Sequence, residues 1–359
     1  MTRNNLQRHT RSRVGTEKSS LRAATSHDVA DLAGVSQKTV SRVINQESCV
    51  SGDTRQRVLR AIEQLNYRPN LLARSLGSAK AHAIGLVYDN PNAYYIIALQ
   101  RGALAACNEL GFDLQIHPSD STDRQFTKQL CDLADRSRLA GLVLAPPMSE
   151  RKTMLRELTN ANVPLVRIIS AAKDPRDGFP CVFVDDRDAA YAITVYLVQL
   201  GHVRIGFLWG RKQFGSSVER YKGYEKALRD YGVPVRKELV LQGDYSFDDG
   251  FRGARHLISL ANPPTAIFGS NDEIAAGVLA AGRAAGLRIP LDLSVAGFED
   301  SPFSRYSWPS LTTARQRTAR IAEQATRLLI AQINGEKTDN KGFSPELVVR
   351  GSTAPPREQ

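Results

Sequence analysis

Short runs of β-branched and apolar residues alternate with helix-like periods over most of the chain, and this alternation restricts the fold strongly. The runs begin at Ala83–Tyr88 and end at Leu293–Phe298, with helical stretches such as Arg187–Leu200, Glu219–Tyr231 and Asp272–Ala285 between them. Strands that alternate with helices form parallel sheets with helices on both faces. Because roughly nine such strands spread over some 270 residues, we expect an α/β fold with two lobes. The other expected strands are Asp113–His117, Gly141–Ala145, Pro164–Ile169, Cys181–Val184, Val203–Trp209, Leu239–Gln242 and Ala266–Phe268.

The composition excludes several other classes of protein. Apolar residues make up 42% of the chain and charged residues 24%, which is an ordinary globular balance. No run reaches the ~18 apolar residues that a membrane span needs, and the first 24 residues lack the apolar run of a secretory signal peptide. The four cysteines show neither metal-ligand spacing nor a paired pattern. We therefore expect a soluble cytoplasmic protein without a metal site.

Positive charge is concentrated at the N-terminal end. Residues 1–80 hold 14 Lys or Arg against 6 Asp or Glu, a net charge of +8. The remaining 279 residues hold 34 against 31, a net charge of +3. This distribution predicts either a polyanion partner at that end or merely a soluble basic tail. Residues 1–24 are polar and basic without periodicity, so we expect a disordered arm.

Residues 25–67 predict three short helices. Thr25-Ser26-His27-Asp28 is a capping box that opens the first helix, and Gly34 follows its end. Ser36 caps a second helix, Gln37–Asn45, and Ser51 caps a third. Two short helices joined by a tight Gly-Val-Ser turn have the helix-turn-helix geometry.

The second helix exposes a face of hydrogen-bonding side chains. Gln can pair bidentately with adenine, whereas Lys and Arg can donate to O6 and N7 of guanine. The alternative is an ordinary three-helix surface with solvated polar groups. The side chains of this face are Gln37, Lys38, Thr39, Ser41 and Arg42.

The motifs of this region resemble the DNA-binding segment of the lac repressor family (LacI/GalR). They include Ala33-Gly34-Val35-Ser36, Thr39-Val40-Ser41-Arg42-Val43-Ile44-Asn45 and Leu65-Asn66-Tyr67-Arg68-Pro69-Asn70, and the match covers about 60 consecutive residues. The resemblance implies that Gln37 and Lys38 read bases and that Arg42 contributes a further base contact. It also implies phosphate contacts, which set register rather than sequence, from Ser36, Thr39 and Asn45.

The segment after the predicted headpiece (residues 25–69) is a candidate hinge. Residues 70–81 contain Ala73-Arg74-Ser75-Leu76, which is similar to the family's hinge helix. The stretch is too short to be a stable helix alone in water. The resemblance implies a helix that forms on DNA and inserts Leu76 into the minor groove; the alternative is a buried linker.

Residues 82–345 resemble the family's effector domain, which is built like a periplasmic sugar-binding protein. The resemblance implies three crossings between the lobes, near 182–186, near 312–316 and near 340, with a ligand bound between the lobes. Residues 346–359 form the expected C-terminal strand and tail. Because no apolar heptad follows, we expect a homodimer rather than a tetramer.

The same resemblance implies a set of residues that bind the effector. Arg220 matches an arginine that reaches the ligand in many members, and Asn271 resembles a ligand contact, whereas Asp272 resembles a helix cap. Two departures are Glu299, where most members have Asp, and Ile169, where many have an acid. The alternative to ligand binding is that Arg220 is a solvated surface residue and that the tyrosines only pack in the protein. The full set is Arg220, Asn271, Glu299, Tyr245, Tyr95, Tyr94, Asp89 and Gln316.

These observations predict an allosteric regulator, most simply a repressor of a sugar-utilisation operon. It would bind a pseudo-palindromic double-stranded operator in the bacterial nucleoid and respond to a small, sugar-like effector. The alternative is the solute-binding protein of a transport system. Because no Gly-rich phosphate loop, metal-spaced His cluster or nucleophile elbow is present, we expect neither an enzyme nor a cofactor.

Overall fold

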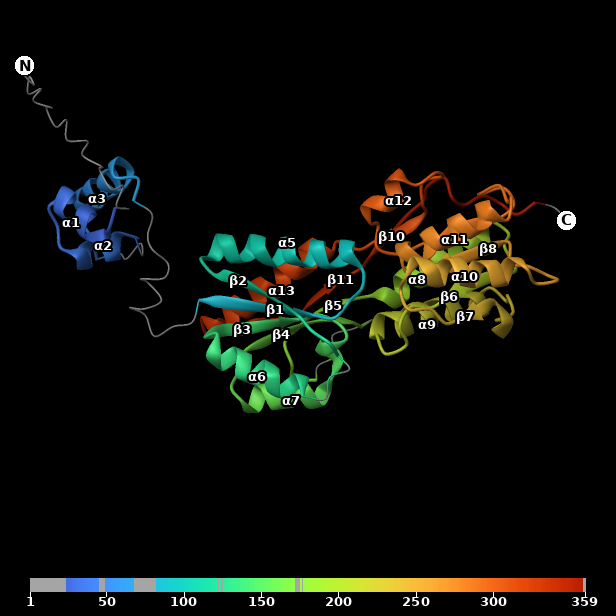
Figure 1. Ribbon diagram of the computed structural model, residues 1–359, viewed down its shortest axis with the longest axis horizontal. Helices are drawn as coiled ribbons and strands as arrows, with labels where there is room; N and C mark the ends of the chain where they lie inside the picture. Colours follow the sequence, from blue (N-terminus) through green and yellow to red (C-terminus); the bar gives the residue numbers. More distant parts are fainter. Residues whose placement is uncertain are drawn as a thin grey trace, which may run out of the picture. The chain divides into compact units, whose positions relative to one another are not determined.

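The structure is a computed structural model that describes residues 24–44, 49–67, 82–121, 123, 125–171, 175 and 177–357 (Figure 1). It divides into two compact units, Met1–Ala79 and Lys80–Gln359. The predicted arm and hinge, including Leu76, and the predicted phosphate contact Asn45 lie outside the described residues. No helix in the described ranges is both long enough and apolar enough to cross a membrane.

The first unit contains the three predicted helices. They are α1 (Ser26–Ala33), α2 (Gln37–Ile44) and α3 (Gly52–Gln64). Their buried apolar side chains face one another and form a small core, which fixes the angle between α1 and α2. The core residues are Val29, Ala30, Ala33, Val40, Val43, Val58 and Ala61.

The second unit begins with a lobe built on a six-stranded parallel sheet in the order β11-β5-β4-β3-β1-β2. Helices α5 and α13 pack against each other on one face of the sheet, and α6 and α7 cover the other (Figure 1). The strands are β1 (Ala83–Tyr88), β2 (Asp113–Pro118), β3 (Leu139–Leu144), β4 (Leu165–Ser170), β5 (Cys181–Val184) and β11 (Lys341–Phe343). The helices are α5 (Ala93–Leu110), α6 (Phe126–Arg136), η1 (Met148–Glu150), α7 (Lys152–Asn160) and α13 (Thr318–Ile333).

The other lobe has a four-stranded parallel sheet in the order β7-β6-β8-β9 and an antiparallel pair, β10 and β12. Helices α8 and α9 cover one face of the four-stranded sheet, and α10 and α11 cover the other. The strands are β6 (Ile205–Leu208), β7 (Val240–Leu241), β8 (Ala266–Gly269), β9 (Ser294–Ala296), β10 (Thr313–Arg315) and β12 (Glu346–Val348). The helices are α8 (Asp186–Gln199), α9 (Gly215–Asp230), η2 (Lys237–Leu239), α10 (Phe247–Ile258), α11 (Asp272–Ala284) and α12 (Pro302–Tyr306).

Both faces of each parallel sheet are buried, which explains the nearly continuous apolar strands in the sequence. In β1, Ile84 and Leu86 pack into the core under α5 and α13, whereas Ala83 and Val87 pack into the core over α6 and α7. Successive side chains of a strand point to opposite faces, so one apolar run supplies both cores. The parallel α/β architecture predicted from the sequence is therefore confirmed.

The chain passes between the lobes more than once. It leaves the first lobe between β5 and α8, returns between β10 and α13, and crosses again between β11 and β12. Several expected elements differ from the structure at their ends, and the difference is four residues in α9, which begins at Gly215 rather than at Glu219. The sequence Gly-Ser-Ser at its start carries no apolar period, so periodicity alone missed the first turn.

Candidate ligand pocket and nucleic-acid interface

The helix-turn-helix of the first unit is set by its caps. The backbone N–H of Thr25 donates to Asp28 over 2.7 Å, and the N–H of Asp28 donates to the Thr25 hydroxyl, so the predicted capping box is confirmed. Gly34 has a φ of 62°, a left-handed conformation that glycine adopts without a steric penalty. The Ser36 hydroxyl accepts from the N–H of Thr39 over 3.2 Å, which makes it the cap of α2.

The start of α2 presents polar groups to solvent. Gln37 and Lys38 are exposed, whereas Thr39 and Arg42 are half-buried. The Gln37 amide donates to the hydroxyl of Ser26 over 2.9 Å, so a residue of α1 fixes this side chain. An exposed amide and an exposed amine at a helix N-terminus are suited to reading base edges in a major groove.

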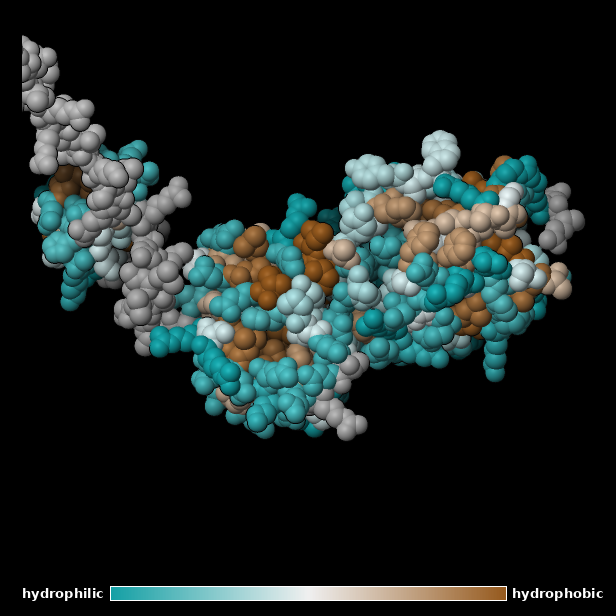
Figure 2. Space-filling model, in the orientation of Figure 1, coloured by the Kyte–Doolittle hydropathy of each residue, from teal (hydrophilic) through white to brown (hydrophobic). Residues whose placement is uncertain are grey.

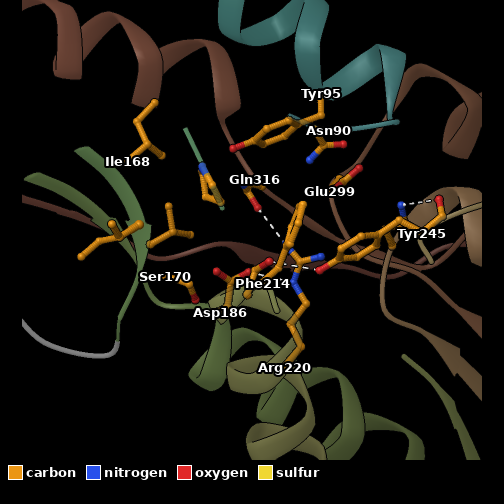
Figure 3. A pocket seen from close by; sticks show the side chains of 15 residues that line it. Asn90, Tyr95, Ile168, Ser170, Asp186, Phe214, Arg220, Tyr245, Glu299 and Gln316 are labelled. Carbon is orange, nitrogen blue, oxygen red and sulfur yellow. Dashed lines mark hydrogen bonds and ion pairs between the residues drawn. The ribbon is translucent and has the colours of Figure 1, made fainter. Parts of the chain in front are cut away.

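A pocket lies between the two lobes of the second unit (Figure 3). Its lining residues follow the carboxyl ends of strands in both sheets, where open α/β folds bind ligands. The lining residues are Asn90, Tyr95, Pro146, Ile168, Ile169, Ser170, Val184, Asp186, Phe214, Ser216, Arg220, Tyr245, Asn271, Glu299 and Gln316. Six of the eight predicted effector residues are among them.

Arg220 is buried at the centre of this set, with 3% of its surface exposed. Its Nε donates to Asp186 over 2.8 Å, Nη1 donates to the carbonyl of Ser270 over 2.6 Å, and Nη2 donates to Gln316 over 3.3 Å. The guanidinium also lies 3.7 Å from the centre of the Phe298 ring. Burial alone would lower the pKa of Arg220, but the surrounding groups, with Asp186 first among them, together outweigh burial and raise it.

The carboxylate partner of Arg220 is Asp186 rather than Glu299. Glu299 instead accepts a hydrogen bond of 2.6 Å from the amide of Asn92, which belongs to the first lobe. Burial raises the pKa of Glu299 to about 8, although the charge of Arg220 lowers it and the nearby Asp272 and Asp186 raise it further. Arg220 lies in the second turn of α9.

Asn271 and Asp272 have roles different from those expected. The Asn271 side chain caps α11 by accepting from the N–H of Ile274 over 2.9 Å, and its amide donates to the carbonyl of Tyr245. Asp272 accepts instead from the N–H of Ser301 and from the hydroxyl of Thr313, each over 2.7 Å. The prediction that Asp272 is the cap is wrong because the preceding residue holds the extended backbone conformation of an N-cap.

The tyrosines divide between two surfaces. Tyr245 is buried, and its hydroxyl forms hydrogen bonds of 3.0 and 2.6 Å with those of Ser216 and Ser217. Tyr95 is buried and lines the pocket, whereas its neighbour Tyr94 is exposed and lines only an adjoining groove, which shares Tyr95 with the pocket. Successive helical residues point about 100° apart, so only one of the pair can face the pocket.

Asp89 also lies outside the pocket lining. Its carboxylate accepts from the N–H of Ser121 over 3.0 Å and lies 3.9 Å from Arg211. Asp89 is the first residue after β1 and does not line the pocket. The next residue, Asn90, lines it instead.

Several pocket residues were not predicted from the sequence. Ser170 is the last residue of β4, Asp186 is the first residue of α8, and Phe214 is the N-cap of α9. These positions at the edge of a sheet are the signal that would have found them. The buried Ser170 hydroxyl has no hydrogen-bond partner among the described residues. Phe214 adds a flat aromatic side chain to the lining, beside the predicted Tyr245.

Comparison with known families matches both units. The family "Bacterial regulatory proteins, lacI family" matches residues 25–70, and the periplasmic binding protein-like domain matches residues 194–353. The chain is 34% identical over 334 residues to the HTH-type transcriptional repressor PurR of Actinobacillus pleuropneumoniae serotype 3 (strain JL03), covering 92% of this chain and 98% of that protein. It is 32% identical to the probable HTH-type transcriptional repressor ExuR of Bacillus subtilis (strain 168), covering 90% and 97%.

Solved structures show the same architecture. A Lac repressor dimer bound to operator and the anti-inducer ONPF aligns with a TM-score of 0.77 at 27% identity and covers 93% of this chain and 100% of that one. A complex of the transcriptional regulator CelR with cellobiose aligns with a TM-score of 0.70 at 29% identity, covering 92% and 99%. These relatives are regulators rather than enzymes, in agreement with the expected class.

Proposed function

Since the chain belongs to the lacI family of bacterial regulatory proteins and is a DNA-binding transcriptional repressor, we propose that it represses a sugar-utilisation operon. In this proposal it binds a pseudo-palindromic operator as a homodimer. An uncharged sugar in the pocket between the lobes controls that binding. The observation that carries the choice of effector is the balance of charge around Arg220.

Among the lining residues that the structure describes, none is an uncompensated cation that could bind an anionic ligand. The guanidinium of Arg220 is held by Asp186, and Glu299 adds a second carboxyl group to the same wall. A sugar acid or sugar phosphate would place its charge beside the buried Asp186 carboxylate, which is unfavourable.

The remaining lining suits hydroxyl groups. The unpartnered hydroxyl of Ser170 and the side-chain amide of Gln316 can serve ligand hydroxyls that both donate and accept. Phe214 and Ile168 offer apolar surface to a ring face. The complex of the related CelR with cellobiose supports the same class of ligand.

The first unit supports the proposed operator contacts. The exposed side chains of Gln37 and Lys38 would read base edges, with Arg42 as a further reader. Ser36, Thr39 and Asn45 would hold phosphates, and Leu76 would enter the minor groove. The match of the family to residues 25–70 supports these assignments.

Apolar surface on the second unit supports a dimer. Tyr94, Ile97 and Leu104 lie at helical spacing on α5 and are largely exposed, and Figure 2 shows hydrophobic side chains along this helix. Near α12, Tyr306 is 84% exposed and Trp308 85%. Large exposed apolar side chains mark interaction surfaces, and a second copy of the chain is the partner that a palindromic operator requires.

A two-stage experiment tests the proposal. The full-length protein is first used to select operators from a random double-stranded library. A gel shift on the selected operator is then repeated with neutral mono- and disaccharides, with hexuronates and with hexose phosphates. We expect a palindromic site and a change in operator affinity with at least one neutral sugar. A response confined to the acids or phosphates would refute the effector class, and a failure to enrich any palindrome would refute the operator assignment.

A further inference from the structure

The N-terminus of α9 receives its cap from the opposite lobe. The residue at the N-cap position, Phe214, provides no side-chain hydrogen bond, so the first turn of α9 depends on other acceptors. Glu150, at the end of η1 in the first lobe, accepts from the N–H of Gly215 over 2.8 Å. A carboxylate at this position also interacts favourably with the positive end of the helix dipole.

The two lobes approach each other closely at this contact. A Cβ atom placed on Gly215 would lie 2.4 Å from the Oε1 atom of Glu150, which is closer than real Cβ atoms come to other atoms. Glycine therefore leaves the space that the carboxylate occupies. The main chain of η1 is itself fixed, since the N–H of Glu150 donates to the carbonyl of Pro147 and the adjacent Met148 is fully buried.

Helix α9, which Glu150 caps, contributes residues that line the pocket or hold its lining in place. Ser216 and Ser217, in its first turn, hold the hydroxyl of Tyr245. Arg220, one turn later, joins Asp186 to Gln316. A shift at the start of α9 would move all of these groups together, because a helix transmits displacement along its axis.

We propose that Glu150 is a positioning residue that closes the lobes: it caps α9 only when they are together, and so couples the closed arrangement to the shape of the pocket. When the lobes separate, the N–H of Gly215 loses its protein acceptor and the first turn of α9 loosens. The inference rests on the proposed function only in treating this pocket as the effector site. The contact itself is tested without any effector.

The test compares full-length variants in the absence of ligand. Glu150→Ala removes the acceptor, whereas Gly215→Ala retains it but displaces it by contact with the new methyl group. The matched control is Ser246→Ala, because Ser246 caps α10 within its own lobe by accepting from the N–H of Asp249 over 3.1 Å. Spin labels at Lys152→Cys and Lys212→Cys, both exposed, report the distance between lobes once Cys49 and Cys131 are replaced by Ser.

We expect hydrogen exchange in the first turn of α9 to become about tenfold faster in both test variants, as for the loss of a helix cap. We also expect the distribution of interlobe distances to lengthen. The control should accelerate exchange in α10 alone and leave the distances unchanged. Unchanged exchange and distances in both test variants, or equal changes in the control, would overturn the proposal. Binding of the selected operator is measured separately, so a failure of the proposed function is recognised independently.

Discussion

Replacing Arg220 by Ala should destabilise the second unit, because the substitution leaves the buried charge of Asp186 without its partner. Asp186, which is 3% exposed, loses the guanidinium that lies 2.8 Å away. Removing one partner of a buried ion pair costs about 3–5 kcal/mol. At about 2.1 cal/mol/K of unfolding entropy per residue, a unit spanning Lys80–Gln359 has an entropy of roughly 0.6 kcal/mol/K. The melting temperature should therefore fall by roughly 5–9 °C.

The assay is thermal unfolding of the ligand-free protein, followed by circular dichroism at pH 7. A second variant, Arg220→Ala with Asp186→Asn, separates the stranded charge from the lost packing. Since the amide is neutral, this variant should recover at least half of the lost stability. A melting temperature within 2 °C of the wild type for Arg220→Ala would refute the burial argument. Equal losses in the single and double variants would show that packing on Phe298, rather than charge, dominates.

The same pair of variants tests the role of Arg220 in binding a sugar. Hydrogen bonds to charged groups contribute about 1.5–3 kcal/mol each, so two lost bonds would weaken binding by roughly two to four decades. Calorimetric titration with whichever sugar shifts the operator complex measures this loss. The double variant should still bind the selected operator, because the DNA-binding helices form a separate unit. Equal sugar affinity in wild type and variant would place the effector elsewhere.

Three further predictions concern the DNA contacts and Glu299. Gln37→Ala or Lys38→Ala should each relax selection at one or two operator positions, at about 1–3 kcal/mol per position; identical enrichment from a random library would contradict this. Leu76→Ala should reduce operator affinity and DNA bending, measured by circular permutation of the site, because a wedge acts only on DNA; an equal bend would contradict it. Because the pKa of Glu299 is raised in the folded state to about 8, its contribution to stability is complete below the ordinary value of 4.5 and is lost as the pH rises toward 8. Glu299→Gln should therefore flatten the pH dependence of the melting temperature between pH 5 and 8, and an unchanged slope would contradict the assignment.

The fold was accessible from the sequence because its determinants are local. The central parallel strands are buried on both faces and appear as short apolar runs, as in β5, whose predicted and observed bounds coincide at Cys181–Val184. The caps of the DNA-binding helices were equally accessible, since Thr25, Ser36 and Ser51 each contact a backbone N–H within three residues. Hydrogen bonds between residues three positions apart can be recognised from a short stretch of sequence.

The location of the pocket was accessible, but the pairing inside it was not. Strand ends meet at one edge of a parallel sheet, so Arg220, Tyr245 and Gln316 could be placed in one region. The partner of Arg220, however, is Asp186, which lies 34 positions away at the start of another helix. Several carboxylates follow strands in this lobe, and sequence spacing does not rank them by distance.

The exchanged roles of Asn271 and Asp272 show where local reasoning fails. Both residue types are good N-caps, and both lie within three residues of the end of β8. The choice depends on which residue keeps an extended backbone: Asn271, with φ of −146° and ψ of 174°, is the N-cap, and Asp272 is already helical. The Asp272 carboxylate is then free to hold Ser301 and Thr313, residues 29 and 41 positions later. Asp272 thus lies one residue inside the helix, where its carboxylate accepts hydrogen bonds from residues distant in the sequence. Asn271, the N-cap, lines the pocket.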